Sequence, residues 1–126
     1  MTILITILSS GERTWNHVAS LIATKKFEKT ILITNENGVK SFPAKFPKFN
    51  TEETKYEFMI VDFEKPAQVL IKDMLMQLSE QHLGFEIAVN FVSGSGKEHM
   101  SFLAALLKLG IAFRPVAMTK EGLTEL

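Results

Sequence analysis

Residues 86–100 read Glu-Ile-Ala-Val-Asn-Phe-Val-Ser-Gly-Ser-Gly-Lys-Glu-His-Met, and this stretch decides the fold. The apolar, β-branched run from Ile87 to Val92 predicts a buried strand. Apolar residues at helical spacing follow from Met100 onward and predict a helix. The residues between them, Ser93-Gly94-Ser95-Gly96-Lys97, begin a tight loop. The stretch therefore predicts a strand, a small-residue loop and a helix in direct succession.

The small-residue loop has the chemistry of an anion-binding corner. Its glycines allow the backbone to turn with positive φ and allow a ligand to approach the main chain. The unpaired N–H groups of the first helical turn point toward such a ligand, at the positive end of the helix dipole. Lys97 adds a full positive charge at the same place. The loop predicts a phosphate site, although Gly-Ser turns also occur for structural reasons alone.

The spacing excludes two common phosphate-binding motifs. The separation between glycine and Lys97 is too short for the Walker A loop. In the dinucleotide motif G-x-G-x-x-G, His99 would occupy the place of the third glycine. The predicted anion site therefore belongs to neither motif.

The N-terminal part repeats the arrangement of strand, polar loop and helix. Ile3 to Leu8 is an apolar run interrupted only by Thr6, typical of a strand buried on both faces, and it is followed by Ser9-Ser10-Gly11. Residues 12–26 carry the apolar spacing of an amphipathic helix, and residues 30–34 predict a second buried strand.

Residues 35–55 predict irregular structure in place of a helix. Residues 35–38 are a turn signal, and residues 39–42 are compatible with a short hairpin arm. Pro43 and Pro47 argue against any long element. The nearby phenylalanines either pack under this loop or form an exposed contact surface.

The C-terminal half continues the alternation. Residues 56–63 predict a third strand, and a helix is expected from Pro66 to about residue 82. The helix after the small-residue loop should end at Gly110, before a fifth strand at residues 111–117. Pro115 predicts that this strand lies at an edge of the sheet or that the proline lies at one end of the strand, and the last residues predict a short tail.

This order of elements predicts an α/β fold in one domain spanning residues 1–126. We expect a small Rossmann-like, doubly wound, mostly parallel sheet of about five strands with helices on both faces. Ligands of such sheets bind beyond the carboxyl ends of the strands, where the strand order reverses. If the first strand is central, the loops after the first and fourth strands meet at that point.

The composition narrows the possible partners. The chain has 126 residues and no net charge, which disfavours binding to duplex DNA. It has no cysteine, which excludes disulfides and thiolate chemistry and favours a cytoplasmic location. The first apolar run is too short to cross a membrane, so no membrane association is expected. The histidines show no metal-ligand spacing, so no metal is predicted.

The stretch from Asn90 to Met100 resembles the CARF domain, the CRISPR-associated Rossmann fold that senses cyclic oligoadenylates. In that family a strand ending in a polar residue is followed by a loop like Thr-Gly-Gly-Thr-Lys and by a helix that begins near a methionine. The chain matches this pattern without gaps but departs from it at Ser95-Gly96, where the family usually has Gly-Thr. The loop Ser9-Ser10-Gly11 resembles the family's other ligand loop.

The resemblance implies a homodimer that cradles cyclic tetra- or hexa-adenylate in type III CRISPR signalling. The stand-alone members that the chain resembles are ring nucleases, which cut the ring without a metal or other cofactor. The resemblance then implies a catalytic pair, Ser10 and Lys97, in which Ser10 positions the 2′-OH or the phosphate and Lys97 stabilises developing charge. The expected ligand-binding residues are Ser9, Gly11, Asn90, Ser93, Gly94, Ser95, Gly96 and His99.

Three hypotheses remain open on the sequence alone. The chain is a cyclic-oligoadenylate protein, whether nuclease or sensor. It is a non-catalytic α/β dimerisation or interaction domain, whose small-residue loop is structural. Or it is a sensor module for another nucleotide or phosphorylated metabolite, which the anion corner fits equally well.

Overall fold

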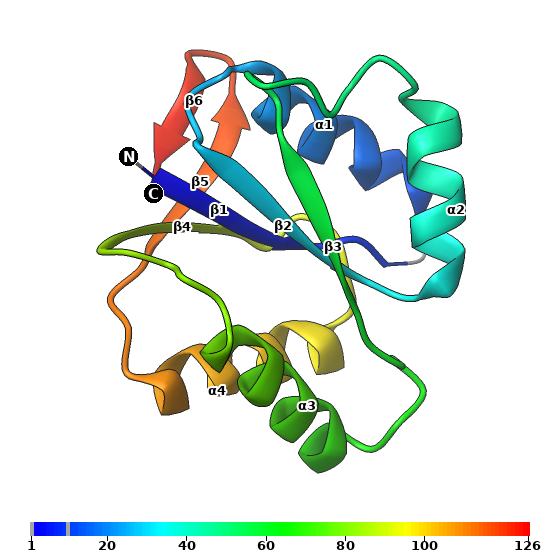
Figure 1. Cartoon of the computed structure of the whole chain (residues 1–126), viewed down its shortest axis with the longest axis vertical. Coiled ribbons are helices and arrows are strands. Elements are labelled where there is room, and N and C mark those ends of the chain that lie inside the picture. Colours follow the sequence, from blue (N-terminus) through cyan, green and yellow to red (C-terminus); the bar gives the residue numbers. More distant parts are fainter. Residues whose placement is uncertain (1, 10) are drawn as a thin grey trace.

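A computed structural model of the chain describes residues 2–9 and 11–126 and shows an α/β fold (Figure 1). The sheet has six strands in the order β3-β2-β1-β4-β5-β6. The strands are β1 (Thr2–Ile7), β2 (Lys29–Thr34), β3 (Tyr56–Ile60), β4 (Glu86–Asn90), β5 (Arg114–Thr119) and β6 (Gly122–Glu125). The first five pair in parallel, and β6 pairs antiparallel to β5.

Four α-helices cover the two faces of the sheet. They are α1 (Trp15–Ala23), preceded by a 3₁₀ turn at Glu12–Thr14, α2 (Glu36–Lys45), α3 (Ala67–Ser79) and α4 (Gly96–Leu109). Helices α1 and α2 lie on one face, and α3 and α4 lie on the other (Figure 1). None of the helices in the described parts of the chain is long and apolar enough to cross a membrane.

The mostly apolar central strands are buried on both faces. In β1, Ile3, Ile5 and Ile7 pack toward α3 and α4, in the same cluster as Phe102. Leu4 points to the opposite face and packs with Leu21 of α1. A strand whose two faces are both covered is expected to be mostly apolar, and β1 is apolar at all its positions except Thr2 and the buried Thr6, whose hydroxyl donates to the Asn90 carbonyl.

Helix α2 corrects the prediction for residues 35–55. Asn35 caps the helix by accepting a hydrogen bond from the Gly38 N–H at 3.0 Å. Pro43 lies inside the helix without ending it, and the Phe46 N–H bonds to the Phe42 carbonyl. The segment therefore supplies the helix between β2 and β3.

The glycine that looked like a turn residue has a packing role. A Cβ atom at Gly38 would collide with the Thr34 side chain, so helix α2 approaches β2 closely only because this position lacks one. Phe42 is fully buried against Trp15 and Tyr56, with ring centroids at 5.9 and 5.4 Å. Of the two expectations for the phenylalanines, packing in the core is correct for Phe42.

The C-terminal end corrects a second prediction. The residues expected to be a tail form β6, so the sheet has six strands and β5 is not at its edge. Pro115 lies near the start of β5, where the strand pairs with β4 over only Ala88↔Arg114 and Val89↔Pro115. The alternative expectation, a strand end at Pro115, describes this position.

The topology places β1 and β4 side by side at the centre of the sheet. Their register pairs Thr6 with Asn90, so both strands end at the same edge. The chain moves outward in one direction through β2 and β3 and in the other through β5, which makes this the point where strand order reverses. The loops after β1 and β4 both leave the sheet here.

Candidate functional site

The loops after β1 and β4 touch each other. The Ser9 N–H donates to the Ser93 hydroxyl at 3.1 Å, and Ser93 is fully buried. The Ser9 carbonyl accepts a hydrogen bond from the Trp15 indole N–H at 2.9 Å. Ser10, the predicted catalytic serine, lies outside the described residues. The two small-residue loops therefore form one continuous edge.

The first turn of α4 is organised by a capping box. The Ser95 hydroxyl accepts a hydrogen bond from the Glu98 N–H at 3.3 Å, and the Glu98 carboxylate accepts one from the Ser95 N–H at 2.8 Å. These bonds satisfy two of the donors at the helix start. Among the described residues, the N–H groups of Gly96 and Lys97 remain without a partner inside the helix, because no turn precedes them. These two donors are the ones that α4 offers to an anion.

The Glu98 carboxylate limits how strongly this corner attracts an anion. It is buried beside the same helix end, and a full negative charge there opposes the positive end of the helix dipole. The Lys97 ammonium supplies the compensating positive charge. Net attraction for an anion therefore depends on Lys97 as well as on the backbone.

Gly94 fixes the shape of the loop. Its φ of +115° lies in the region that side chains rarely adopt. A Cβ atom there would lie 3.1 Å from Glu98 Oε1, 3.1 Å from His99 Nε2 and 3.3 Å from Ile7 Cγ2. This position requires glycine for both reasons, whereas a Cβ at Gly96 would meet nothing within 4 Å.

Lys97 reaches toward the next loop along the edge. Its ammonium donates to the Phe63 carbonyl at 2.9 Å, in the loop between β3 and α3. An ammonium group has three N–H donors, so this bond leaves two for a ligand. Lys97 therefore connects the anion corner to the β3–α3 loop.

The side chain of Asn90 makes its hydrogen bonds within the sheet and with the residues that follow β4. Its amide N–H donates to the Val116 carbonyl at 2.8 Å, and its amide oxygen accepts from the Val92 N–H at 3.1 Å. The amide nitrogen also lies 3.4 Å from Nε2 of His17. With 2% of its surface exposed, Asn90 joins β4 to β5 in this state of the protein and does not face the loops' outer edge.

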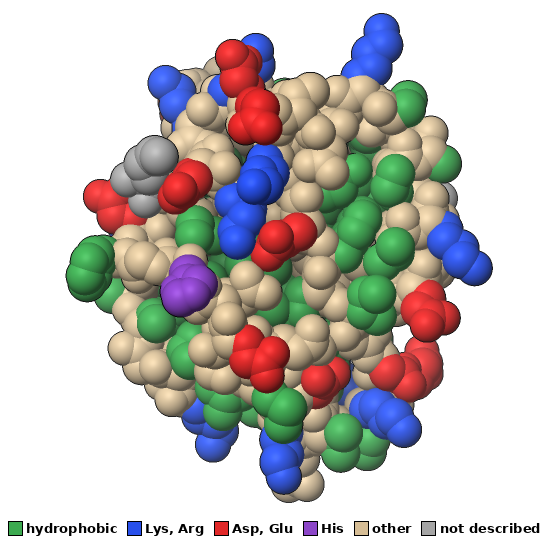
Figure 2. Space-filling model, viewed as in Figure 1, with side chains coloured by type: hydrophobic (Ala, Val, Ile, Leu, Met, Phe, Trp, Pro, Cys, Tyr) green, Lys and Arg blue, Asp and Glu red, His purple; other side chains and the backbone are tan. Residues whose placement is uncertain are grey.

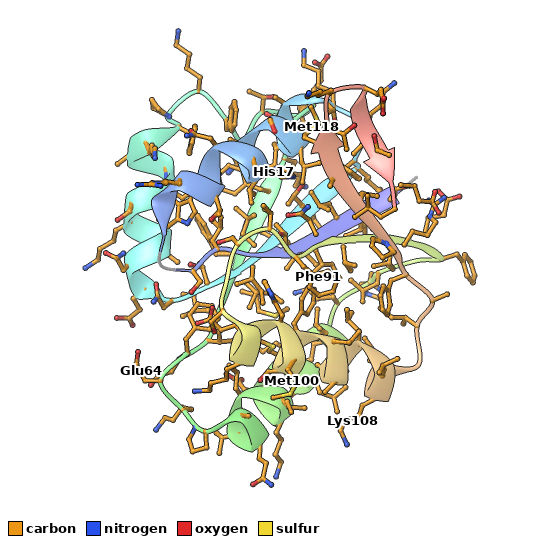
Figure 3. The ribbon with its side chains drawn as sticks, turned by 180° about the vertical axis from the view of Figure 1, so that it is seen from behind. His17, Glu64, Phe91, Met100, Lys108 and Met118 are labelled. Carbon is orange, nitrogen blue, oxygen red and sulfur yellow. The ribbon has the colours of Figure 1, made fainter. Side chains whose placement is uncertain are left out.

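His17, which the sequence left without a role, anchors α1 to β5. Its Nε2 accepts a hydrogen bond from the Met118 N–H at 3.1 Å, so this nitrogen carries no proton. Figure 3 shows the two residues next to each other, on α1 and on β5. Burial lowers the pKa of His17, because the charged imidazolium is less well solvated there.

His99 points back toward the sheet. Its Nε2 donates to the Ser93 carbonyl at 2.8 Å, since a carbonyl oxygen only accepts. Its ring packs edge-on against Phe91, with centroids 5.7 Å apart. His99 therefore holds the loop in place, and it does not point its Nε2 at the exposed corner.

Gly11 completes the first loop with an exposed backbone. Its φ is +93°, and its carbonyl accepts hydrogen bonds from both the N–H and the hydroxyl of Thr14. These bonds begin the 3₁₀ turn that leads into α1. The predicted ligand residues that are exposed or half-buried at the outer edge are Gly11, Gly94, Ser95 and Gly96, and the predicted catalytic Lys97 lies beside them. His99 is half-buried and bonds to the loop, and Ser9, Asn90 and Ser93 are buried.

No protein-family model matches the chain, and no curated protein sequence matches it. The resemblance to the CARF family therefore rests on the sequence of the two loops alone.

A cavity at the same edge was not predicted. It has a volume of about 590 Å³, and its lining consists of Asn35, Glu36, Asn37, Ile60, Val61, Asp62 and Asp73. Three of these residues are carboxylates, so the cavity disfavours a phosphate and suits hydroxyl or amino groups that donate hydrogen bonds. The polar residues that follow β2 and β3 were the available signal for it.

The buried polar side chains of the described residues make hydrogen bonds within the protein. None of their buried side-chain nitrogen or oxygen atoms lacks a hydrogen-bond partner. Within the same residues, no three His, Asp or Glu side chains lie close enough together to hold a metal ion. The loops after β1 and β4 therefore offer a ligand backbone N–H groups, hydroxyls and one lysine, and the cavity at the same edge offers carboxylates and amides.

Proposed function

We propose that this protein binds a cyclic oligoadenylate as a CARF-type homodimer in type III CRISPR signalling and cleaves it as a metal-independent ring nuclease. The observation that carries the proposal is the contact between the loops that resemble the two CARF ligand loops, at Ser9 and Ser93. That contact lies where the strand order reverses, which is where sheets of this kind bind ligands. We expect the protein to act in the cytoplasm.

The corner suits a phosphodiester. The N–H groups of Gly96 and Lys97 and the two remaining donors of the Lys97 ammonium give several hydrogen bonds to the non-bridging oxygens. Charge on those oxygens increases as the reaction proceeds, so donors fixed in place stabilise the transition state more than the ground state. Lys97 has this electrostatic role in the proposal.

Cleavage follows from the chemistry of the ligand. The ribose 2′-oxygen attacks the adjacent phosphorus, and the bond from phosphorus to the 5′-oxygen breaks. The 2′-OH proton passes to solvent and the 5′-oxygen takes one up, which leaves a 2′,3′-cyclic phosphate and a 5′-hydroxyl. The protein contributes the in-line geometry of these atoms, which is the role proposed for Ser10.

The acidic cavity fits the remainder of such a ligand. Asp62, which lines the cavity, lies in the same loop as Phe63, whose carbonyl receives Lys97. Adenine amino groups and ribose hydroxyls donate hydrogen bonds that carboxylates and amides accept. A phosphate at the corner and a nucleoside toward the cavity would match both parts of the edge.

The first test is incubation of the purified protein, in EDTA, with cyclic tetra-adenylate and cyclic hexa-adenylate. The mixtures are followed by liquid chromatography and mass spectrometry. Linear products that end in a 2′,3′-cyclic phosphate support the nuclease. Intact rings that co-elute with the protein indicate a sensor, and intact rings without binding contradict the proposal.

Two variants assign the roles of the site. Lys97→Ala should abolish binding or cleavage, whereas Lys120→Ala, an exposed lysine in the β5–β6 turn, should not. Ser10→Ala should lower turnover more than affinity. Preferential binding of ATP or a dinucleotide would instead favour the sensor of another nucleotide.

A further inference from the structure

Another cavity lies at the amino end of β1, away from the candidate site. It has a volume of about 430 Å³, which is within the range of small-molecule sites. Three segments far apart in the sequence form it: the start of β1, the loop between α1 and β2, and the β5–β6 hairpin. In Figure 1 the end of β6 lies next to the start of β1.

This cavity and the anion corner lie at opposite ends of β1. Thr2, which lines the cavity, pairs with Glu86 at the start of β4. Thr6 pairs with Asn90, where β4 ends and the chain leads to the anion corner. A ligand bound in the cavity therefore does not occupy the site of the proposed function, and no step of the proposed cleavage depends on it.

The floor of the cavity is apolar. Phe27, Ala88 and Val116 are only 9%, 2% and 8% exposed, and Leu123 is half-buried. All four belong to, or pack against, the hydrophobic cluster that includes Leu21 of α1. An apolar group that enters the cavity would therefore leave water for a surface made by the core, which is favourable.

The rim of the cavity carries charges of both signs. Lys26 and Arg114 are cations, and Glu125 is an anion. Arg114 Nη1 lies 3.5 Å from Glu125 Oε2, and the two side chains are 48% and 56% exposed. A direct charge-assisted hydrogen bond is shorter, about 2.7–2.9 Å, so both groups keep hydrogen-bonding capacity for a ligand. Figure 2 shows acidic and basic side chains gathered at the upper left of the molecule, where Figure 1 places the hairpin.

A further carboxylate lies at this end of the sheet. Glu86 accepts a hydrogen bond from the Thr2 hydroxyl at 3.0 Å, and this bond and the Arg114 guanidinium lower the pKa of its carboxyl. Cations and anions are thus both present around the cavity. A ligand with an ammonium and a carboxylate complements both signs, whereas a ligand with one charge complements only one.

We propose that this cavity binds an α-amino acid with an apolar side chain. The ammonium and the carboxylate of an α-amino acid are bonded to the same carbon, so they fit the adjacent charges of Glu125 and Arg114. The carboxylate accepts hydrogen bonds from Arg114 and Lys26, and the ammonium donates to Glu125. The side chain covers the apolar floor at Phe27 and Leu123.

Such a ligand contacts the α1–β2 loop and the β5–β6 hairpin at the same time. The backbone of the hairpin pairs with β4 over only Ala88↔Arg114 and Val89↔Pro115. A ligand that joins the hairpin to the loop stabilises the attached hairpin, because it binds that state in preference to a detached one. Binding should therefore slow amide hydrogen exchange in β5 and β6 more than in α3.

The test compares L-phenylalanine with three analogues that each lack one of its groups. Phenethylamine lacks the carboxylate, 3-phenylpropionate lacks the ammonium, and glycine lacks the apolar side chain. Shifts of the backbone amide signals in NMR spectra of the full chain, without nucleotide, measure binding and locate it. L-Phenylalanine should bind saturably and shift signals of the α1–β2 loop, β5 and β6.

The analogues should bind more weakly in a defined order. Loss of one half-exposed ion pair should weaken phenethylamine and 3-phenylpropionate by about fivefold each. Loss of the phenyl ring should weaken glycine by about tenfold or more. Equal affinities for L-phenylalanine and its analogues, no saturable binding, or shifts located in α3 and α4 would overturn the proposal.

Two variants assign the charges. Arg114→Gln should reduce the advantage of L-phenylalanine over phenethylamine, and Glu125→Gln should reduce its advantage over 3-phenylpropionate. Arg13→Gln is the matched control, because Arg13 is the other arginine of the chain and is exposed beyond the carboxyl end of β1, and it should keep the wild-type affinities. Equal effects of Arg114→Gln and Arg13→Gln would also contradict the proposal. Because the analogues are compared on the wild type, the proposal stays testable if a variant does not fold.

Discussion

The two loops of the candidate site are held in different ways. The loop after β4 is fixed by bonds among its own residues and the first turn of α4: Ser95 and Glu98 cap each other, and His99 binds the Ser93 carbonyl. In the described part of the loop after β1, the Ser9 carbonyl accepts from the Trp15 indole, the Ser9 N–H donates to Ser93, and the Gly11 carbonyl accepts from Thr14. These residues are therefore held by neighbouring elements. The loop after β4 is therefore held mostly by its own residues, whereas the described part of the loop after β1 depends on helix α1 and on Ser93 of the other loop.

The largest effect is expected where the self-supporting loop is broken. Gly94→Ala adds a Cβ at a φ of +115° and within 3.3 Å of three neighbouring atoms. Backbone strain and overpacking together should lower the free energy of unfolding by about 3 kcal/mol. Urea denaturation followed by circular dichroism measures it.

The control for this substitution lies two residues further on. Gly96→Ala places its Cβ in open space at the start of a helix, where alanine is favoured over glycine. It should leave stability unchanged or raise it by less than about 1 kcal/mol. Similar losses for both alanine variants would mean that Gly94 is not specially required.

A smaller effect is expected where the dependent loop loses its support. Trp15→Phe keeps an aromatic ring but removes the indole N–H that binds the Ser9 carbonyl. A buried carbonyl without a partner should cost about 2 kcal/mol. Amide hydrogen exchange should show lost protection at Ser9 while the first turn of α4 keeps its protection. Loss of protection confined to the first turn of α4 would contradict the difference described between the two loops.

The bond between the two loops should contribute less. Ser93→Ala removes the hydroxyl that accepts from the Ser9 N–H, at a cost of about 1 kcal/mol. Ser101→Ala is the matched control, because its hydroxyl only adds a bond to the Lys97 carbonyl, an acceptor already inside a helix. Denaturation midpoints compare the two variants. A larger loss for Ser101→Ala would contradict the role given to Ser93.

The smallest expected effect is a dependence of stability on pH that comes from His17, the residue that anchors α1 to β5. Burial lowers the pKa of His17 in the folded protein below the unfolded value of about 6.5, so the unfolded chain binds the proton more readily. The stability that neutral His17 provides is complete above that value. It is lost as the pH falls from there through the lower, folded pKa.

His17→Gln tests this assignment, because a glutamine amide oxygen can accept the Met118 N–H at any pH. The variant should show a flatter dependence of the melting temperature on pH between 7 and 5 than the wild type. His82→Gln, at an exposed histidine in the loop before β4, is the control and should keep the wild-type dependence. If the melting temperature of His17→Gln depended on pH as steeply as that of the wild type, His17 would not be the source of the dependence.

The sequence predicts the strand–loop–helix unit of residues 86–100 because its signals are local. Ser93 to Gly96 can only turn, and the apolar spacing after them is helical. Helix α2 was not predicted because its signals are misleading when taken locally. Gly38 is needed against Thr34, which belongs to another element, and Pro43 is accommodated inside the helix.

In the candidate site, too, some features could be predicted from local sequence and others could not. The positions of both loops follow from the order of the strands, which fixes β1 and β4 as neighbours. The hydrogen-bond partners of the side chains in the site do not follow from the order of the strands. Lys97 binds a carbonyl 34 residues away, and Asn90 joins β5 rather than facing a ligand. Such long-range contacts leave no pattern in one sequence, because any polar residue at the right place would satisfy them.

The short pairing between β4 and β5 has a consequence for how the molecule opens. The backbone of the β5–β6 hairpin pairs with the rest of the sheet at two positions only. The side-chain bonds of Asn90 and His17 and the packing of Val116, Met118 and Leu123 on the core complete its attachment. Its own strands pair over four positions. Because few backbone bonds tie the hairpin to β4, we expect it to be the part of the sheet that opens first. The six-stranded sheet is, in this sense, a parallel body of β3, β2, β1 and β4 and a two-stranded hairpin held to it in part by the neutral imidazole of His17.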